Sequence, residues 1–193
     1  MLERIGIWSS RAAGRLGLKA ALCRFRHRQD GAATVEFALV AVPFLALLFA
    51  IIETALVFFA SQVLETAVAD SARLILTGQA QTQGLDQTKF KDEVCSRIYG
   101  LFDCQNGLYV DVKSYPSFSN LDMSMPIDPK TGKLVDNFNY SAGGPGSIVV
   151  VRLYYQWPLY VSLLGFDQSL ANMGTNTRLL VATAAFRNEP YTN

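Results

Sequence analysis

The sequence predicts an α+β protein in which one long N-terminal helix, apolar at first and then amphipathic, packs on a small antiparallel β-sheet. The run from Phe37 to Ala60 is apolar except for Glu53 and Thr54. From 61 to 77, apolar residues recur every three or four positions, which continues the helix with one apolar face. Three later segments are rich in β-branched and aromatic residues and are separated by turn-forming stretches, which favours an antiparallel sheet of three or four strands. These segments are 107–115, 147–157 and 178–187.

The apolar run is long enough to cross a membrane. About 20 apolar residues span a hydrocarbon core of ~30 Å, whereas the apolar part of a secretory signal has only about 7–15. Residues 1–30 contain seven basic and two acidic residues, so they carry +5 while the whole chain carries +1, which leaves −4 for the remainder. Because a positive flank stays in the cytoplasm, residues after about 60 are expected to face outward.

This charge and hydropathy pattern divides the chain into three parts. Residues 1–31 form a basic, cytoplasmic leader, and residues 32–60 form a transmembrane helix. Residues 61–193 form an outer α+β domain, in which the helix continues to about residue 77. With 193 residues, the chain has room for one spanning helix and one modest domain.

Three residues of the long helix have individual expectations. Pro43 removes one backbone hydrogen bond inside the apolar half, so we expect a bend near residues 39–43. Gly78 is expected to end the helix as a left-handed C-cap. Glu53 lies near the far end of the span, where we expect its carboxylate to reach the outer membrane interface.

The outer domain is expected to contain a loop at 79–84, a second helix at 86–102 and a half-buried first strand at 107–115. In that strand one face is apolar and the other is polar. A long irregular loop, rich in proline and glycine, is expected at 116–146, with a hairpin around 130–133. The short apolar segment 160–166 fits either a strand or a surface turn. In the first strand, 107–115, the apolar face carries Leu108, Val110 and Val112, and the polar face carries Tyr109, Asp111 and Lys113.

Two of the three cysteines, Cys95 and Cys104, lie in the expected outer domain. In one unbroken helix they would be about 13 Å apart, beyond the ~7 Å limit for a disulfide. A bridge therefore requires the helix to end near Tyr99–Gly100 or Phe102. We expect the disulfide, because oxidation is normal outside the cytoplasm; the alternative is two free buried thiols.

Catalytic and nucleic-acid-binding chemistry find little support in the residues. His27, the only histidine, lies in the leader, so a Ser-His or Cys-His nucleophile or a histidine metal site in the outer domain is excluded. A Cys-x-x-Cys redox motif is also absent from the sequence. Membrane topology explains the basic residues of the leader without nucleic-acid binding. We therefore expect a non-enzymatic protein with no cofactor and no metal.

Glu36 stands at the start of the apolar run, where a charge is costly. If the chain were cut after Gly31, Ala32 would become a charged N-terminus, with Glu36 one helical turn away. That charge would then pair with the carboxylate. The alternative is a carboxylate that reaches the cytoplasmic interface of the membrane.

These residues carry a family resemblance. Gly31, followed by Glu36 and Phe37 and placed between a basic leader and an apolar helix, resembles the class III leader of type IV pilins. The stretch Thr34–Leu39, and Ala72-Arg73 before Gly78, resemble the TadE-like pilin-related proteins of tight-adherence pili. The ending 186–191, and the Cys95/Cys104 pair ahead of a strand, are similar to that family as well.

The resemblance implies a pilin-like fold and cleavage between Gly31 and Ala32 by an aspartic prepilin peptidase of the inner membrane. Ala32, Glu36 and Phe37 would then serve assembly, with Glu36 paired to the Ala32 ammonium of its own or a neighbouring subunit. The implied partners are the peptidase, other pilin or pseudopilin subunits, the inner-membrane pilus assembly machinery and the lipid bilayer.

The resemblance further implies a minor pilin or pseudopilin, at the tip or base of a pilus for surface attachment and biofilm formation, because the shaft subunit of this pilus class is expected to be very short. Its location would be the inner membrane, as a single-pass protein with a cytoplasmic N-terminus and a periplasmic C-terminal domain, or the pilus tip after assembly. Three alternatives stay open. They are an uncleaved single-pass anchor with an outer binding domain, a type II secretion pseudopilin, and ordinary secretion with cleavage after Ala69.

Overall fold

The computed structural model describes residues 31–98, 100, 102–122, 124–135, 137–160, 170–173 and 176–191. The leader and most of the ambiguous segment 160–166 therefore lie outside the described residues. The chain divides into two compact units, residues 1–48 and 49–193. All contacts between the long helix and the sheet that are given below lie within the second unit.

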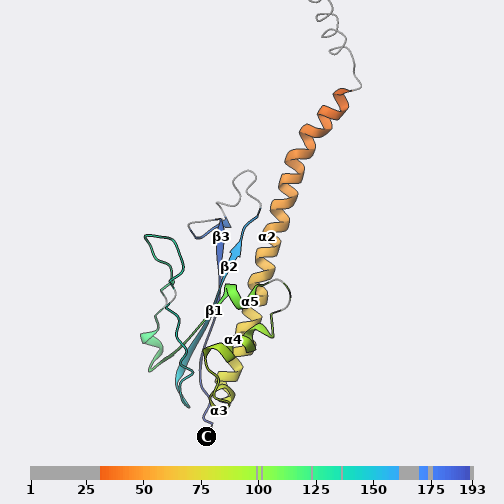
Figure 1. The fold of residues 1–193 in the computed structure, drawn as a ribbon. Coiled ribbons are helices and arrows are strands. Elements are labelled where there is room, and N and C mark those ends of the chain that lie inside the picture. The colour runs from red at the N-terminus through yellow and green to blue at the C-terminus, as the bar shows by residue number, and fades with distance from the viewer. Residues whose placement is uncertain are drawn as a thin grey trace, which may run out of the picture. The chain divides into compact units, whose positions relative to one another are not determined.

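The long N-terminal helix is α2 (Ala32–Leu76), a single α-helix of 45 residues (Figure 1). It is rich in alanine and leucine, which are among the best helix formers. Its bounds agree with the sequence prediction to within a residue at each end. Pro43 lies inside the helix, and the bend expected near 39–43 stays a prediction.

The C-terminus of α2 is closed by Gly78, as predicted. Its backbone is in the left-handed region, with φ 77°, and its N–H donates to the carbonyl of Ile75 at 3.1 Å. A Cβ on Gly78 would also lie 2.4 Å from Cγ of Tyr191. The C-terminal segment completes the cap, because the N–H of Glu189 donates to the carbonyl of Leu76 at 2.9 Å.

The sheet has three antiparallel strands in the order β1 (Leu108–Tyr115), β2 (Ile148–Pro158) and β3 (Thr177–Arg187). Asp111 is opposite Arg152 in the first pair, and Leu153 is opposite Ala182 in the second. The predicted strands match these bounds to within one residue. The α+β class with an antiparallel sheet is therefore confirmed.

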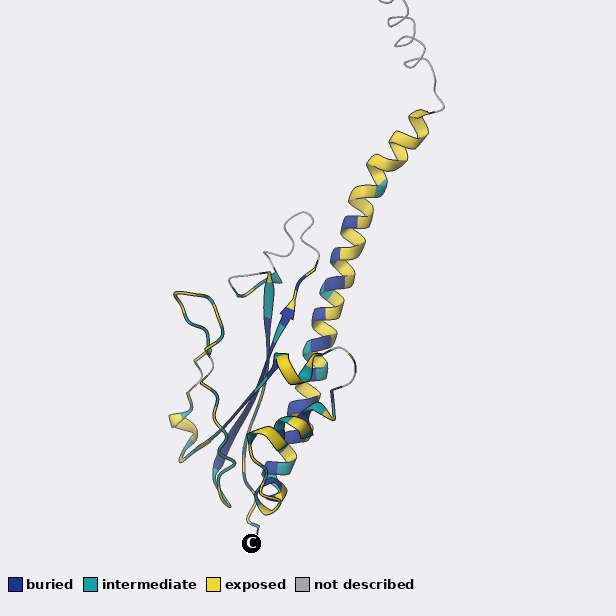
Figure 2. Cartoon of the chain, viewed as in Figure 1, coloured by how far each residue is buried: buried dark blue, intermediate teal, exposed yellow. Residues whose placement is uncertain are grey.

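One face of α2 packs against the sheet from Val57 to Ile75 (Figure 2). The small residues along this face let the helix backbone approach the strands closely. Leu64 and Ile75 are fully buried in the core between α2 and the sheet. Val149, Val151 and Leu153 of β2 fill the centre of the same core. This is a pilin-like architecture. The small buried residues of α2 are Ala60, Ala67 and Ala72.

The second face of the sheet is covered too, which corrects the expectation that Asp111 faces solvent. Residues 116–146 fold back over this face, and Phe138 lies between Tyr109 and Tyr154, with ring centroids 5.3 and 5.5 Å away. Buried Asp111 accepts a hydrogen bond from the N–H of Asn139 at 3.0 Å. The first strand is therefore buried on both faces over most of its length.

The loop 116–146 has little regular structure, as expected. It contains one 3-10 turn, η2 (Phe118–Asn120), and an isolated antiparallel bridge between Ile127 and Leu134, which encloses the predicted turn at 130–133. Buried Arg152 donates to the carbonyl of Asp122, which ties the loop to β2.

The second predicted helix is shorter than expected. It is α4 (Gln87–Cys95), and its N-terminus is capped by Asp86, whose side chain accepts from the N–H of Lys89 at 2.8 Å. The predicted continuation to 102 is wrong. The chain instead turns, with Gly100 at φ 69°, and reaches the single-turn helix α5 (Cys104–Gly107). The expected loop at 79–84 also contains one helical turn, α3 (Gln79–Thr82).

Candidate processing and assembly site

Gly31 lies directly before the first residue of α2 and is exposed. A Cβ built on Gly31 would meet no atom within 4 Å. The fold described here therefore gives no steric reason for glycine at this position, in contrast to Gly78. A glycine that the fold does not need is available for a close approach of another molecule to the backbone.

Ala32 begins α2, and Glu36 follows four residues later. Residues four apart in an α-helix lie on the same face, about 6 Å apart along the axis. Glu36 is exposed, and Phe37 beside it is 74% exposed. The structure thus places Ala32 and Glu36 one turn apart at the start of the helix, with free access to both.

The first half of α2 exposes large apolar side chains (Figure 2). In its most apolar 18-residue stretch only 11% is buried, which differs from the core helix of a soluble protein. An apolar surface of this extent needs a lipid or protein partner. Among the described residues this is the one helix whose length and composition fit a membrane span. The exposed residues are Val35, Phe37, Leu39, Val40, Val42, Phe44, Leu45, Leu47, Leu48, Phe49, Ile51 and Ile52.

Most of helix α2 matches a known protein family. Residues 31–73 match the family model of TadE-like proteins. The match begins at Gly31, includes Glu36 and runs nearly to the end of α2, so the resemblance seen in the sequence is confirmed for this segment. TadE-like proteins are pilin-related, generally non-enzymatic and associated with the machinery of Tad pili. No curated protein and no solved structure matches the chain.

Glu53 of α2 is buried, whereas the sequence prediction had its carboxylate extending freely toward the outer membrane interface. Its level relative to the membrane stays a prediction. Its carboxylate oxygen Oε1 accepts a hydrogen bond from the backbone N–H of Tyr160. Tyr160 comes just after β2, next to buried Leu159, whose N–H donates to the carbonyl of Asn176 at 2.9 Å. The chain leaving the sheet therefore supplies the donor that holds this carboxylate against the domain.

Cys95 and Cys104 form a disulfide, with 5.8 Å between their Cα atoms. This distance is possible because α4 ends at Cys95 itself, earlier than the limit deduced from the sequence. Phe102, between the two cysteines, packs edge-on against Tyr155 and Trp157 at 4.7 and 5.7 Å. The bridge thus holds the α4–α5 connection over the end of β2.

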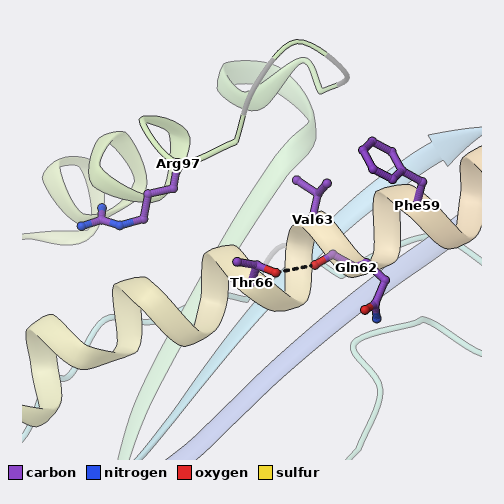
Figure 3. Close-up of a pocket in the computed structure, with 5 residues that line it drawn as sticks. All are labelled: Phe59, Gln62, Val63, Thr66 and Arg97. Atoms are coloured by element: carbon purple, nitrogen blue, oxygen red, sulfur yellow. Dashed lines mark hydrogen bonds between the residues drawn. The ribbon is translucent and has the colours of Figure 1, made fainter.

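An open groove of about 400 Å³ lies between α2 and the residues after α4. In Figure 3, Phe59 and Val63 project from the same side of α2, whereas the amide of Gln62 points away from them. The Arg97 guanidinium is paired with Glu93 at 2.6 Å. The sequence pattern missed this groove because it depends on the early end of α4. Its lining residues are Phe59, Gln62, Val63, Thr66 and Arg97.

In the part of the chain that the structure describes, no group of three or more His, Cys, Asp or Glu residues could hold a metal ion. The candidate site that the structure describes is an exposed surface with one carboxylate, Glu36. It consists of the exposed start of α2, from Gly31 to Phe37, and the apolar helix behind it.

Proposed function

We propose that this chain is a minor pilin or pseudopilin of a tight-adherence pilus. In this proposal it is a non-enzymatic subunit that a prepilin peptidase cleaves between Gly31 and Ala32. The apolar half of α2 anchors the subunit in the inner membrane, with the leader in the cytoplasm and the sheet domain in the periplasm, and later packs among the helices of other subunits.

The observation that carries this proposal is the arrangement at the start of the TadE-like helix. Exposed Gly31 has no steric role in the described fold, helix α2 begins at the very next residue, and Glu36 is one turn further on. A peptidase that must contact the backbone closely favours glycine before the cut. Cleavage there would leave an intact helix whose first residue is the new N-terminus.

The charges give a physical reason for Glu36. A carboxylate among lipids or packed apolar helices is costly unless it is paired. The Ala32 ammonium that cleavage creates is a partner of opposite charge, on the same subunit or on a neighbour. A pair between neighbours would set the axial offset of two helices, because apolar side chains alone tolerate sliding.

The test is the N-terminus of the mature protein. The full-length chain is expressed with and without a prepilin peptidase, extracted from membranes and analysed by mass spectrometry. We expect an N-terminus at Ala32 only when the peptidase is present. An intact N-terminal leader in both cases would contradict the proposal and favour the uncleaved single-pass anchor.

A matched pair of variants tests the role of the glycine. Gly31→Val places a branched side chain before the cut, and we expect cleavage to be lost. Ala38→Val introduces the same side chain at an exposed position two turns into the helix, where cleavage is expected to continue. Equal cleavage of both variants would show that Gly31 is not the recognised residue.

A further inference from the structure

Exposed apolar residues continue further along α2 on the side away from the sheet than on the side that faces it. On the side that faces the sheet, Glu53 is buried and Val57 and Ala60 follow it into the core. On the other side, Phe58 and Phe59 are still 66% and 57% exposed. Helical periodicity places both phenylalanines well away from the buried face.

A third exposed aromatic residue comes from the sheet domain. The ring of Tyr160 is 81% exposed, although Leu159 before it is buried. The backbone of Tyr160 is fixed to Glu53 by its N–H. Six residues of helix separate Glu53 from Phe59, which is about 9 Å along the axis. Aromatic side chains therefore lie on different sides of α2 within a short stretch of its length.

We propose that Phe58, Phe59 and Tyr160 form a lipid-contact collar in the outer interface of the membrane. The inference rests on the membrane anchoring proposed above. Residues 32–52 form about 31 Å of helix, enough to cross a ~30 Å hydrocarbon core before Glu53 is reached. The residues just after Glu53 then lie at the level of the headgroups.

The chemistry of the collar fits this level. Tyrosine, whose ring has one polar edge, is enriched at membrane interfaces, which applies to Tyr160. The two phenylalanines of the collar supply apolar surface to the acyl-chain side of the same level. Between Glu53 and Glu65, α2 carries no charged residue. The polar side chains of Gln62 and Glu65, both exposed, mark where the far side of the helix enters water.

The distribution of the rings favours lipid over a neighbouring helix. One partner helix would cover a single stripe, and close helix contacts in membranes use small residues. Here two bulky neighbours, Phe58 and Phe59, cover adjacent sectors of α2. Tyr160, whose backbone is bonded to Glu53 on the sheet-facing side, adds a third exposed ring. A fluid interface can contact all three at once. The sheet domain would then rest on the membrane at the end of β2.

Depth measurements on the full chain test this proposal. Cys23 is replaced by serine, and the disulfide between Cys95 and Cys104 leaves no other thiol. Single cysteines carrying a nitroxide are then placed at 58 and 160, with Leu45 as the span control and exposed Ala69 as the water control. The protein is reconstituted in phosphatidylethanolamine–phosphatidylglycerol vesicles, and collisions with oxygen and with a water-soluble nickel chelate are compared.

We expect labels at 58 and 160 to favour oxygen over nickel more than the label at 69 and less than the label at 45. Nickel accessibility at 58 and 160 equal to that at 69, with the label at 45 in lipid, would overturn the collar alone. Labels at 58 and 160 shielded from both reagents, with spin–spin broadening that unlabelled protein removes, would assign this surface to a second copy and also overturn it.

The same measurement separates this inference from the proposed function. A label at 45 that is exposed to nickel would overturn membrane anchoring and the collar together. Loss of cleavage would not affect the depths, so the Gly31→Val chain is expected to give the same values as the parent.

Discussion

The backbone N–H of Tyr160 donates a hydrogen bond to the buried carboxylate of Glu53, which lies 107 residues earlier in the chain. This bond joins the chain just after β2 to the middle of α2. Glu53 thus holds the domain in register along the helix.

Glu53→Ala should destabilise the sheet domain. The substitution removes the acceptor of a partly buried backbone donor, the N–H of Tyr160, and leaving such a donor unpaired costs about 1 kcal/mol. Thermal unfolding of the full chain in detergent, followed by circular dichroism, is the measurement. Glu65→Ala is the matched control, because Glu65 is exposed and accepts a hydrogen bond from the side-chain amide of neighbouring Gln62 at 2.8 Å. Equal unfolding temperatures for the two variants would contradict the role assigned to Glu53.

Glu36→Gln should be processed normally but should fail to assemble. The variant keeps the helix and the size of the side chain, and it loses the charge that pairs with the Ala32 ammonium. Mass spectrometry checks the N-terminus, and recovery of the subunit in sheared pili or crosslinked assemblies checks assembly. Glu65→Gln, an exposed change on the same helix, should assemble like the parent. Parental assembly of Glu36→Gln would refute charge pairing.

The regular elements could be predicted because their signals are local. Apolar periodicity locates α2, and runs of β-branched and aromatic residues locate the strands. The burial of Asp111 and Glu53 could not be predicted from the sequence, because their hydrogen-bond partners Asn139 and Tyr160 lie 28 and 107 residues away. The early end of α4 could not be predicted either, because the apolar spacing continues beyond Cys95 although the chain turns there, with Gly100 at φ 69°.

The candidate site also has features that the sequence could predict and features that it could not. Gly31 and Glu36 stand out in the sequence because a glycine and a carboxylate at the start of an apolar run are unusual. The sequence could not show that Gly31 is free of steric demands while Gly78 is not. That contrast requires the position of Tyr191, more than 100 residues from Gly78 along the chain.

Loss of the disulfide should lower stability by roughly 2.5–3 kcal/mol, the chain-entropy value for a loop of about ten residues. The variant is Cys95→Ser/Cys104→Ser, and chemical denaturation of the full chain is the measurement. Cys23→Ser is the control, which should unfold like the parent. A reducing agent should destabilise the parent and leave the double variant unchanged. Equal sensitivity of both proteins to reduction would argue against the bridge.

Gly78→Ala should destabilise the cap of α2 for two separable reasons. The positive φ costs a residue with a Cβ about 1–2 kcal/mol, and the new Cβ overlaps the ring of Tyr191. Gly84→Ala is the matched control, because its φ is 61° and a Cβ there meets no atom within 4 Å. We expect Gly78→Ala to cost clearly more than Gly84→Ala. In a Tyr191→Ala background the difference should shrink, and an unchanged difference would reject the steric contribution.

Tyr140→Phe should make the domain less sensitive to alkali. Burial, together with the smaller effect of the nearby Asp86 carboxylate, raises the pKa of Tyr140 from its ordinary value of 10.0 to about 12. Between these values the unfolded chain loses the phenolic proton while the folded chain keeps it, so stability falls as the pH rises from about 10 to 12. The hydroxyl has no hydrogen-bond partner among the described residues, so removing it should cost little at pH 7. Denaturation midpoints at pH 7 and pH 11 check this: the decrease should be smaller in Tyr140→Phe than in the parent, and equal decreases would contradict the burial of this phenol.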